Sequence, residues 1–295
     1  MAEWIHSCLD WRGPSGTVAA GGLITDKNAM DSIPVIPGDT LLYKFRALDN
    51  AEFAADILLN HRLFAAPPSS FNDPFDCNES DSFSATEEEK IDRAVARIRK
   101  EDPSVGDEKA RRLAPDRCKS AETNGSARNR TWKESELGVV SLAGTVTNPL
   151  LWAHYASGHT GIAIEFCASD LRHAEFFGNA LPVVYQLERP VVNFYRDEFT
   201  EKVHKLLLTK SQDWAYEREW RIIVQNRQKQ PYIYFDPAVL RAVYLGCRIA
   251  DDRREVVRGW LCGRSSFPAP PLFQARPSDT KYGLVFEQLS TTDLV

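Results

Sequence analysis

The sequence has no excess of positive charge and no long apolar run. Its 295 residues carry a formal net charge of -5 at pH 7, which argues against wrapping of nucleic acid by bulk electrostatics and leaves only a local basic cleft for such binding. No stretch approaches the ~18 to 20 apolar residues of a membrane helix, and the N-terminus lacks the pattern of a signal peptide. We therefore expect a cytoplasmic protein without a membrane partner.

Paired cysteines are also absent, and no internal repeat is found. The six cysteines are scattered and include no CxxC pair, so neither a zinc site nor a disulfide framework is indicated; they are Cys8, Cys77, Cys118, Cys167, Cys247 and Cys262. Buried free thiols are the expected outcome, and no metal is expected. The hydrophobic content of 43% is sufficient for a substantial core.

What is present indicates one α+β domain with a mixed central β core. Residues 1–38, rich in Gly, Ala, Ser and Asp, are predicted to be a weakly structured extension, and residues 39–295 the folded domain. Apolar and alternating segments predict strands at 40–48, 137–142, 161–166, 181–187, 219–225, 231–237, 242–249, 270–278 and 282–289. Helical periodicity predicts helices at 50–66, 86–100, 150–158, 200–217 and 251–264.

A charged helical insertion, or a lid over the core, is predicted at about 84–136, and not an independent domain. Thr86 and Glu89 have the spacing of a capping box at the start of its first helix. Further along, ETNGSARNR at 122–130 is predicted to be a mobile turn, because it combines glycine with small polar residues.

The loop FNDPFD, at 71–76, combines two acids, an amide and two aromatic rings. One interpretation is a rigid loop that fixes its own geometry, since Asn and Asp bond local backbone amides and proline holds its predecessor extended. The other is a pocket wall that presents Asn72 or Asp73 to a ligand. Two acids without a nearby histidine make a poor metal site.

The helix LLWAHYASG brings Trp152, His154 and Tyr155 within two turns, with His159 just beyond. These rings either pack into the core with their polar tips bonded, or form an aromatic surface on which a planar ring stacks. The two histidines do not share a face well enough to chelate a metal.

In DWAYEREWRIIV the side-chain period changes from helical to alternating, which places Glu217, Glu219 and Arg221 on one face at the entrance of a strand. Such a carboxylate pair can bind a ribose diol or stabilise the cationic transition state of a sugar. The alternative is a structural Glu–Arg bridge at the junction of a helix and a strand.

The early strand LYKFR carries Lys44 and Arg46 on one face. Both cations are solvated in the simplest interpretation. If this strand lies beside the one that carries the two glutamates, they become candidates for holding the phosphates of a dinucleotide.

With these motifs, the chain resembles a bacterial family of uncharacterised proteins that share LYKFR, FNDPFD, a central NPLLWAHYASGHTGIAIEF block and WAYEREWRI. The resemblance runs from about Leu41 to Gly246. It implies a common fold and brings no established activity.

A more distant resemblance is to mono-ADP-ribosyltransferases, and it implies NAD as substrate and two packed sheets around the site. By this resemblance Arg46 or Lys44 holds NAD, and Ser141 or Tyr155 fills the middle position. Glu219 is then the catalytic acid, and Glu217 completes an ExE pair. The cofactor-binding residues it implies, together with the loop and the aromatic helix, are Lys44, Arg46, Asn72, Asp73, Ser141, Trp152, His154, Tyr155 and Arg221.

The resemblance also implies a mechanism. Nicotinamide stacks on Tyr155 or Trp152, while Glu219 anchors the ribose and stabilises the cation that forms as nicotinamide leaves. Glu217 orients or deprotonates an acceptor, either protein or nucleic acid. Water as acceptor gives an NAD glycohydrolase. Such an enzyme fits the role of a bacterial toxin, effector or defence protein.

Two other classes stay open. A metal-dependent nuclease would hold Mg²⁺ with acids drawn from several motifs and use Lys210 near the scissile phosphate; those acids are Asp73, Asp76, Glu165 and Glu217. A non-catalytic ligand-sensing or interaction module would use the same motifs only to brace the fold.

Overall fold

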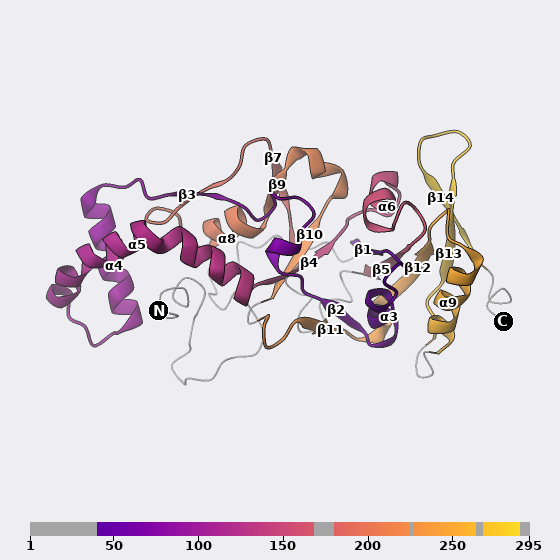
Figure 1. Cartoon of the computed structure of the whole chain (residues 1–295), viewed down its shortest axis with the longest axis horizontal. Coiled ribbons are helices and arrows are strands. Elements are labelled where there is room, and N and C mark those ends of the chain that lie inside the picture. The colour runs from indigo at the N-terminus through magenta and orange to yellow at the C-terminus, as the bar shows by residue number, and fades with distance from the viewer. Residues whose placement is uncertain (1–39, 168–179, 225–226, 264–267, 290–295) are drawn as a thin grey trace.

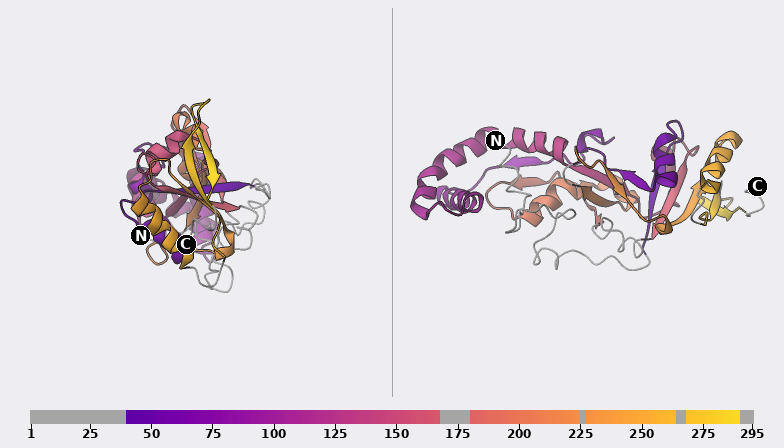
Figure 2. Two further views of the ribbon diagram at one scale, coloured as in Figure 1. Left: turned by 90° about the vertical axis from the view of Figure 1, so that its right-hand side faces the viewer. Right: turned by 90° about the horizontal axis from the view of Figure 1, so that it is seen from below.

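The computed structural model describes residues 40–167, 180–224, 227–263 and 268–289, so the predicted extension at 1–38 lies outside the described residues. The molecule is elongated, as Figure 1 and the right-hand view of Figure 2 show. A helical arm of α4 (Glu87–Glu101) and α5 (Asp107–Glu136) lies at one end, and α9 (Asp251–Cys262) lies at the other. Most of the strands lie between them.

The larger sheet has five strands in the order β1-β5-β12-β13-β14. Their bounds are Leu41–Arg46, Ile162–Cys167, Leu240–Leu245, Leu272–Pro277 and Leu284–Gln288. Only the pair of β12 and β13 is parallel. Every residue of β5 is buried, and this burial accounts for its apolar sequence, IAIEFC, since both of its faces are covered.

A second sheet has the order β4-β10-β6, with bounds Gly138–Leu142, Trp220–Val224 and Leu181–Pro182. It meets the larger sheet at β1, where Tyr43 and Ala143 exchange two backbone hydrogen bonds of 2.8 Å. Strand β1, which carries Lys44 and Arg46, therefore lies next to β4. Strand β4 in turn lies next to β10, which begins just after Glu219.

Three two-stranded sheets and several short helices complete the described part of the chain. The small sheets pair β2 (Arg62–Phe64) with β11 (Tyr232–Tyr234), β3 (Ser80–Ser82) with β8 (Val191–Asn193), and β7 (Val184–Gln186) with β9 (Thr209–Ser211). The remaining helices are α3 (Glu52–Leu59), η1 (Pro68–Ser70), α6 (Pro149–Tyr155), α8 (Phe199–Leu207), η3 (Gln212–Glu217) and η4 (Pro237–Val239). The predicted mixed α+β fold is confirmed.

Among the described residues, no helix combines the length and apolarity needed to cross a bilayer.

The arm of α4 and α5 has an apolar cluster of its own, to which Phe194 and Tyr195 also contribute. The mobile turn predicted at 122–130 is wrong, because this segment lies inside the continuous helix α5. Gly125 is buried there, and a Cβ at that position would lie 3.3 Å from the ring of Phe83 and 3.5 Å from that of Phe194. The glycine therefore serves close packing of the helix against two stacked rings and does not mark a turn.

The predicted capping box at the start of α4 is confirmed. Thr86 Oγ1 accepts from the Glu89 backbone N–H, and the Glu89 carboxylate accepts from the Thr86 N–H. We expect Thr86→Ala to lower the free energy of unfolding by about 1 kcal/mol, since it leaves helix donors unpaired. Urea unfolding measures this change. Thr123→Ala, at an exposed position within α5, is the control, and an equal loss in both variants would contradict the role of the cap.

The predicted helix at 200–217 is corrected to three elements. Helix α8 ends at Leu207, β9 follows, and η3 leads to Glu217. Leu206, Leu207 and Leu208 are all buried, and consecutive residues of a helix point about 100° apart, so a helix cannot bury all three on one face. The chain instead leaves the helix and pairs in parallel with β7. The predicted strand 181–187 is likewise divided between two sheets, as β6 and β7.

Candidate functional site

Arg221 is the centre of a buried charge cluster. Its side chain is 0% exposed and lies on β10, opposite Ser141 of β4. Its guanidinium contacts both oxygens of Glu219 at 2.8 and 3.0 Å, Asp76 Oδ2 at 2.5 Å and the Leu207 carbonyl oxygen at 2.8 Å. Arginine suits such a place, because its planar fork donates in several directions at once.

Lys210 is a second buried cation in the cluster and shares its carboxylates. Its Nζ lies 2.7 Å from Glu217 Oε2, 3.1 Å from Glu219 Oε2 and 3.5 Å from Asp76 Oδ2. Lys210 reaches this position because β9 pairs with β7, which places it opposite Tyr185. Burial lowers the pKa of Lys210, but the three carboxylates outweigh that effect and raise it, so the amine stays protonated.

The backbone between the two glutamates makes their convergence possible. Glu217 ends the 3₁₀ helix η3, and Arg218 has a left-handed backbone with φ 49°. The next N–H, that of Glu219, donates to the Tyr185 hydroxyl at 2.7 Å. The expected strand alternation from Glu217 is therefore corrected, because Glu217 lies on a helix and only the residues from Trp220 lie on β10. The left-handed turn brings both carboxylates to one amine.

The two carboxylates have pKa values shifted in opposite directions. Burial tends to raise the pKa of Glu219, but the charges of Arg221 and Lys210 lower it to about 2. Burial raises the pKa of Glu217, and the bonds from Lys210 and Tyr155 offset this only in part. Glu219 is thus a fixed negative charge, whereas Glu217 binds a proton more readily than an ordinary glutamate does.

These opposite shifts predict how stability depends on pH. The pKa of Glu219 falls from 4.5 to about 2 on folding, so its stabilising effect is complete above pH 4.5 and is lost as the pH falls toward 2. The raised pKa of Glu217 acts in the opposite sense, since its protonated form is the one favoured by folding. We expect the difference in free energy of unfolding between the wild type and Glu219→Gln to be smaller at pH 3 than at pH 7. Urea unfolding at both pH values checks this, and an unchanged difference would contradict it.

Tyr155 connects the cluster to the surface. Its hydroxyl donates to Glu217 Oε1 at 2.6 Å and accepts from the exposed Asn72 amide at 3.4 Å. The ring is half-buried, and burial together with the charge of Glu217 raises the pKa of Tyr155. A ligand at this surface would meet the Tyr155 hydroxyl first, with Glu217 directly behind it.

Two more of the predicted residues adjoin the cluster. The Ser141 side chain helps to lower the pKa of Glu219, and Lys44 Nζ donates to the Ser141 carbonyl oxygen at 2.6 Å. Burial and the neighbouring charge of Arg46 lower the pKa of Lys44, and Glu219 opposes that shift. Lys44 is half-buried, so its amine lies at the edge of the cluster.

The other predicted residues have described contacts with partners other than the two glutamates. The Arg46 guanidinium lies 6.0 Å from the centre of the Phe53 ring, and burial lowers its pKa to about 10. Trp152 is fully buried and donates its indole N–H to the Val146 carbonyl at 2.7 Å. The Asp73 carboxylate accepts from a backbone N–H two residues further along its own loop. The ring of His154 is exposed and lies against Tyr155.

The acids named for a nuclease divide between different places. Asp76 and Glu217 lie beside Lys210, whereas Glu165 accepts from the Tyr244 hydroxyl at 2.6 Å on the larger sheet. Within the described part of the chain, no group of three or more His, Cys, Asp or Glu side chains is arranged to hold a metal ion. The buried amine and guanidinium stand between the carboxylates.

Sequence reasoning missed Tyr185 and named Asp76 and Lys210 only as parts of a nuclease site. The bond from Tyr185 to the Glu219 backbone depends on the parallel pairing of β7 and β9, which leaves no local signal. The link between Asp76 and Arg221 joins residues 145 positions apart. The motifs FNDPFD and EWR each place a charged residue beside apolar residues. This was the only sequence signal that Asp76 and Arg221 form an ion pair.

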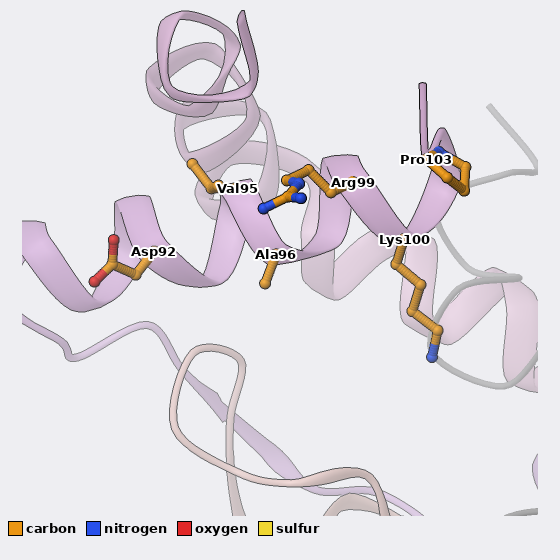
Figure 3. A pocket seen from close by; sticks show the side chains of 6 residues that line it. All are labelled: Asp92, Val95, Ala96, Arg99, Lys100 and Pro103. Carbon is orange, nitrogen blue, oxygen red and sulfur yellow. The ribbon is translucent and has the colours of Figure 1, made fainter. Parts of the chain in front are cut away.

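Two surface pockets lie outside the cluster. One, of about 430 Å³, lies along α4 and is lined by Asp92, Val95, Ala96, Arg99, Lys100 and Pro103, which Figure 3 labels. The other, of about 430 Å³, is lined by residues 186–191 with Lys205 and Thr209. Neither contains a residue of the charge cluster among those that line it.

Comparison with known proteins finds a family match that includes most of the charge cluster, and this family has no assigned activity. No curated protein and no solved structure matches the chain. Residues 151–222 match the model of a family described as a protein of unknown function (DUF2971). That segment holds Tyr155, Lys210, Glu217, Glu219 and Arg221, so in this segment, which includes most of the charge cluster, the chain is similar to an uncharacterised domain family.

Proposed function

We propose that the chain is an NAD-consuming enzyme that breaks the glycosidic bond between nicotinamide and ribose. The observation that carries this proposal is the glutamate pair: Glu217 and Glu219 share the amine of Lys210, yet their pKa values move in opposite directions. Neighbouring carboxylates with separated pKa values are characteristic of glycosidic chemistry, in which one stays ionised and the other exchanges a proton.

The distribution of contacts suggests a different division of roles from that implied by the transferase resemblance. Both oxygens of Glu219 are bonded to Arg221 and Lys210, and its side chain is 4% exposed. Glu219 is therefore proposed as a positioning residue whose fixed negative charge favours the positive charge that develops on the ribose. Glu217 is proposed to act on the proton, through Tyr155.

The proposed step transfers ADP-ribose from nicotinamide to an acceptor. The bond between the ribose C1′ and the nicotinamide nitrogen breaks, and its electron pair leaves with neutral nicotinamide. An acceptor O–H or N–H group forms the new bond to C1′. Its proton moves to the Tyr155 oxygen while the Tyr155 proton passes to Glu217, 2.6 Å away. A protein or nucleic acid as acceptor gives ADP-ribosyl transfer, and water gives NAD hydrolysis.

The rim of the cluster fits a dinucleotide. Lys44 provides a half-buried amine for phosphate, and Asn72 provides an exposed amide beside the Tyr155 hydroxyl. Phosphate binding would also offset the lowered pKa of Lys44, since a nearby anion favours the charged amine.

The test is release of nicotinamide from NAD by the purified full chain, followed by chromatography with and without EDTA. We expect release in both samples. Intact NAD together with cleavage of DNA or RNA that EDTA abolishes and Mg²⁺ restores would overturn the proposal in favour of the nuclease.

A second candidate is a non-catalytic ligand-binding module. It is favoured by the fact that both oxygens of Glu217, like those of Glu219, already have bonding partners. In that case NAD would raise the melting temperature without being consumed.

A further inference from the structure

A group of aromatic rings lies beside the charge cluster, and we name it the aromatic platform. It consists of His154 and Tyr155 from α6 and Trp214 and Tyr216 from η3. Ring centres are 5.8 Å apart for His154 and Trp214, 5.9 Å for Trp214 and Tyr216, and 6.2 Å for His154 and Tyr155. All four are at least partly exposed, so together they form a surface that meets solvent.

The two elements that carry the platform are tied to each other. Asn148, at the N-terminus of α6, accepts from the Leu150 N–H at 2.9 Å and places its amide 3.5 Å from the Tyr216 carbonyl oxygen. The Tyr155 hydroxyl bonds Glu217 at the end of η3. These two contacts fix α6 and η3 relative to each other. The rings are therefore already ordered, and less side-chain entropy is lost when a ligand stacks on them.

A buried cation lies under one of the rings. Lys210 Nζ is 4.9 Å from the centre of the Trp214 ring, and the lysine is buried whereas the indole is partly exposed. The face of the indole toward the cluster is therefore taken by a cation–π contact. That cation attracts the π electrons of the indole inward, so the outer face is less favourable for a second cation than for a neutral ring.

We propose that the aromatic platform binds a neutral planar heteroaromatic base, of the purine class, by stacking on the outer face of Trp214. This deepens the proposed function, on which the choice of ligand rests: for NAD, the ring on the platform is adenine and not the cationic nicotinamide. Every base has a flat π face that can stack on an aromatic side chain. The platform therefore distinguishes a neutral ring from a cationic ring more strongly than it distinguishes one base from another.

The experiment is isothermal titration of the full chain with adenosine and, separately, with the cationic 1-methyladenosine. Adenosine is expected to bind the wild type, and its Kd to rise at least about fivefold in Trp214→Ala. Trp214→Phe keeps a flat ring and retains most of the affinity. Tyr282→Ala, which removes a fully exposed ring on the loop between β13 and β14, leaves the Kd unchanged. 1-Methyladenosine is expected to bind more weakly than adenosine.

Each contrary outcome overturns a stated part of the proposal. Undetectable adenosine binding by the wild type, or an unchanged Kd in Trp214→Ala, removes the platform as a binding site. Equal binding of 1-methyladenosine removes the preference for a neutral ring. Melting temperatures show whether each variant is folded, and His154→Ala, at an exposed ring, is expected to weaken binding even if Trp214→Ala does not fold. Nicotinamide release from NAD, measured on the same samples, reports separately on the proposed function.

Discussion

Replacing Arg221 with leucine is expected to lower the free energy of unfolding by about 3–5 kcal/mol. The guanidinium is completely buried and is bonded to Glu219 and Asp76, both of which are nearly inaccessible. Its loss leaves two buried carboxylates with only Lys210 to balance them, and uncompensated buried charge is costly. Urea unfolding of the wild type and the variant measures the change.

A surface ion pair provides the matched control. Arg93 pairs with Glu198 at 3.2 Å, and both side chains are exposed. Arg93→Leu should therefore cost less than about 1 kcal/mol. Combining Arg221→Leu with Asp76→Asn and Glu219→Gln should recover part of the loss, because it removes the stranded charges along with the cation. Equal losses for Arg221→Leu and Arg93→Leu would show that the cluster does not brace the fold.

Replacing Glu217 with glutamine is expected to lower NAD consumption at least about a hundredfold, which is the usual size of a general acid–base contribution. Glutamine keeps the shape of the side chain and can still accept from Tyr155, but it cannot take up the proton. The folded structure should persist, because Glu219 and Asp76 continue to neutralise Lys210 and Arg221. Initial rates of nicotinamide release measure the effect.

A second glutamate in a similar setting is the control for this variant. Glu165 is also buried and also accepts from a tyrosine hydroxyl, that of Tyr244, at 2.6 Å, but it lies on β5, outside the charge cluster. Glu165→Gln is expected to leave NAD consumption close to that of the wild type. If both glutamine variants lose activity equally, the loss follows from damage to the core and not from the role of Glu217. Tyr155→Phe should resemble Glu217→Gln, since it interrupts the same proton route.

The residues of one short segment show how far sequence reasoning reaches into this site. WAYEREWR indicated that two carboxylates and an arginine act together, and the structure brings Glu217, Glu219 and Arg221 into one cluster. Local sequence did not indicate which other charged residues adjoin the two glutamates. The tertiary structure places Lys210 and Asp76, both from other elements, in the same cluster.

The sequence by itself determined the features that depend on neighbours along the chain. The capping box at Thr86, the strands β1, β5 and β10, and the α+β class follow from side-chain periodicity and from hydrogen bonds between residues three or four apart. Only the tertiary structure decided the continuity of α5 through Gly125, the break after α8 and the partners of the buried charges. Those depend on packing and strand register between segments that are distant in the sequence, where a buried charge takes whichever counter-charge the fold brings within reach.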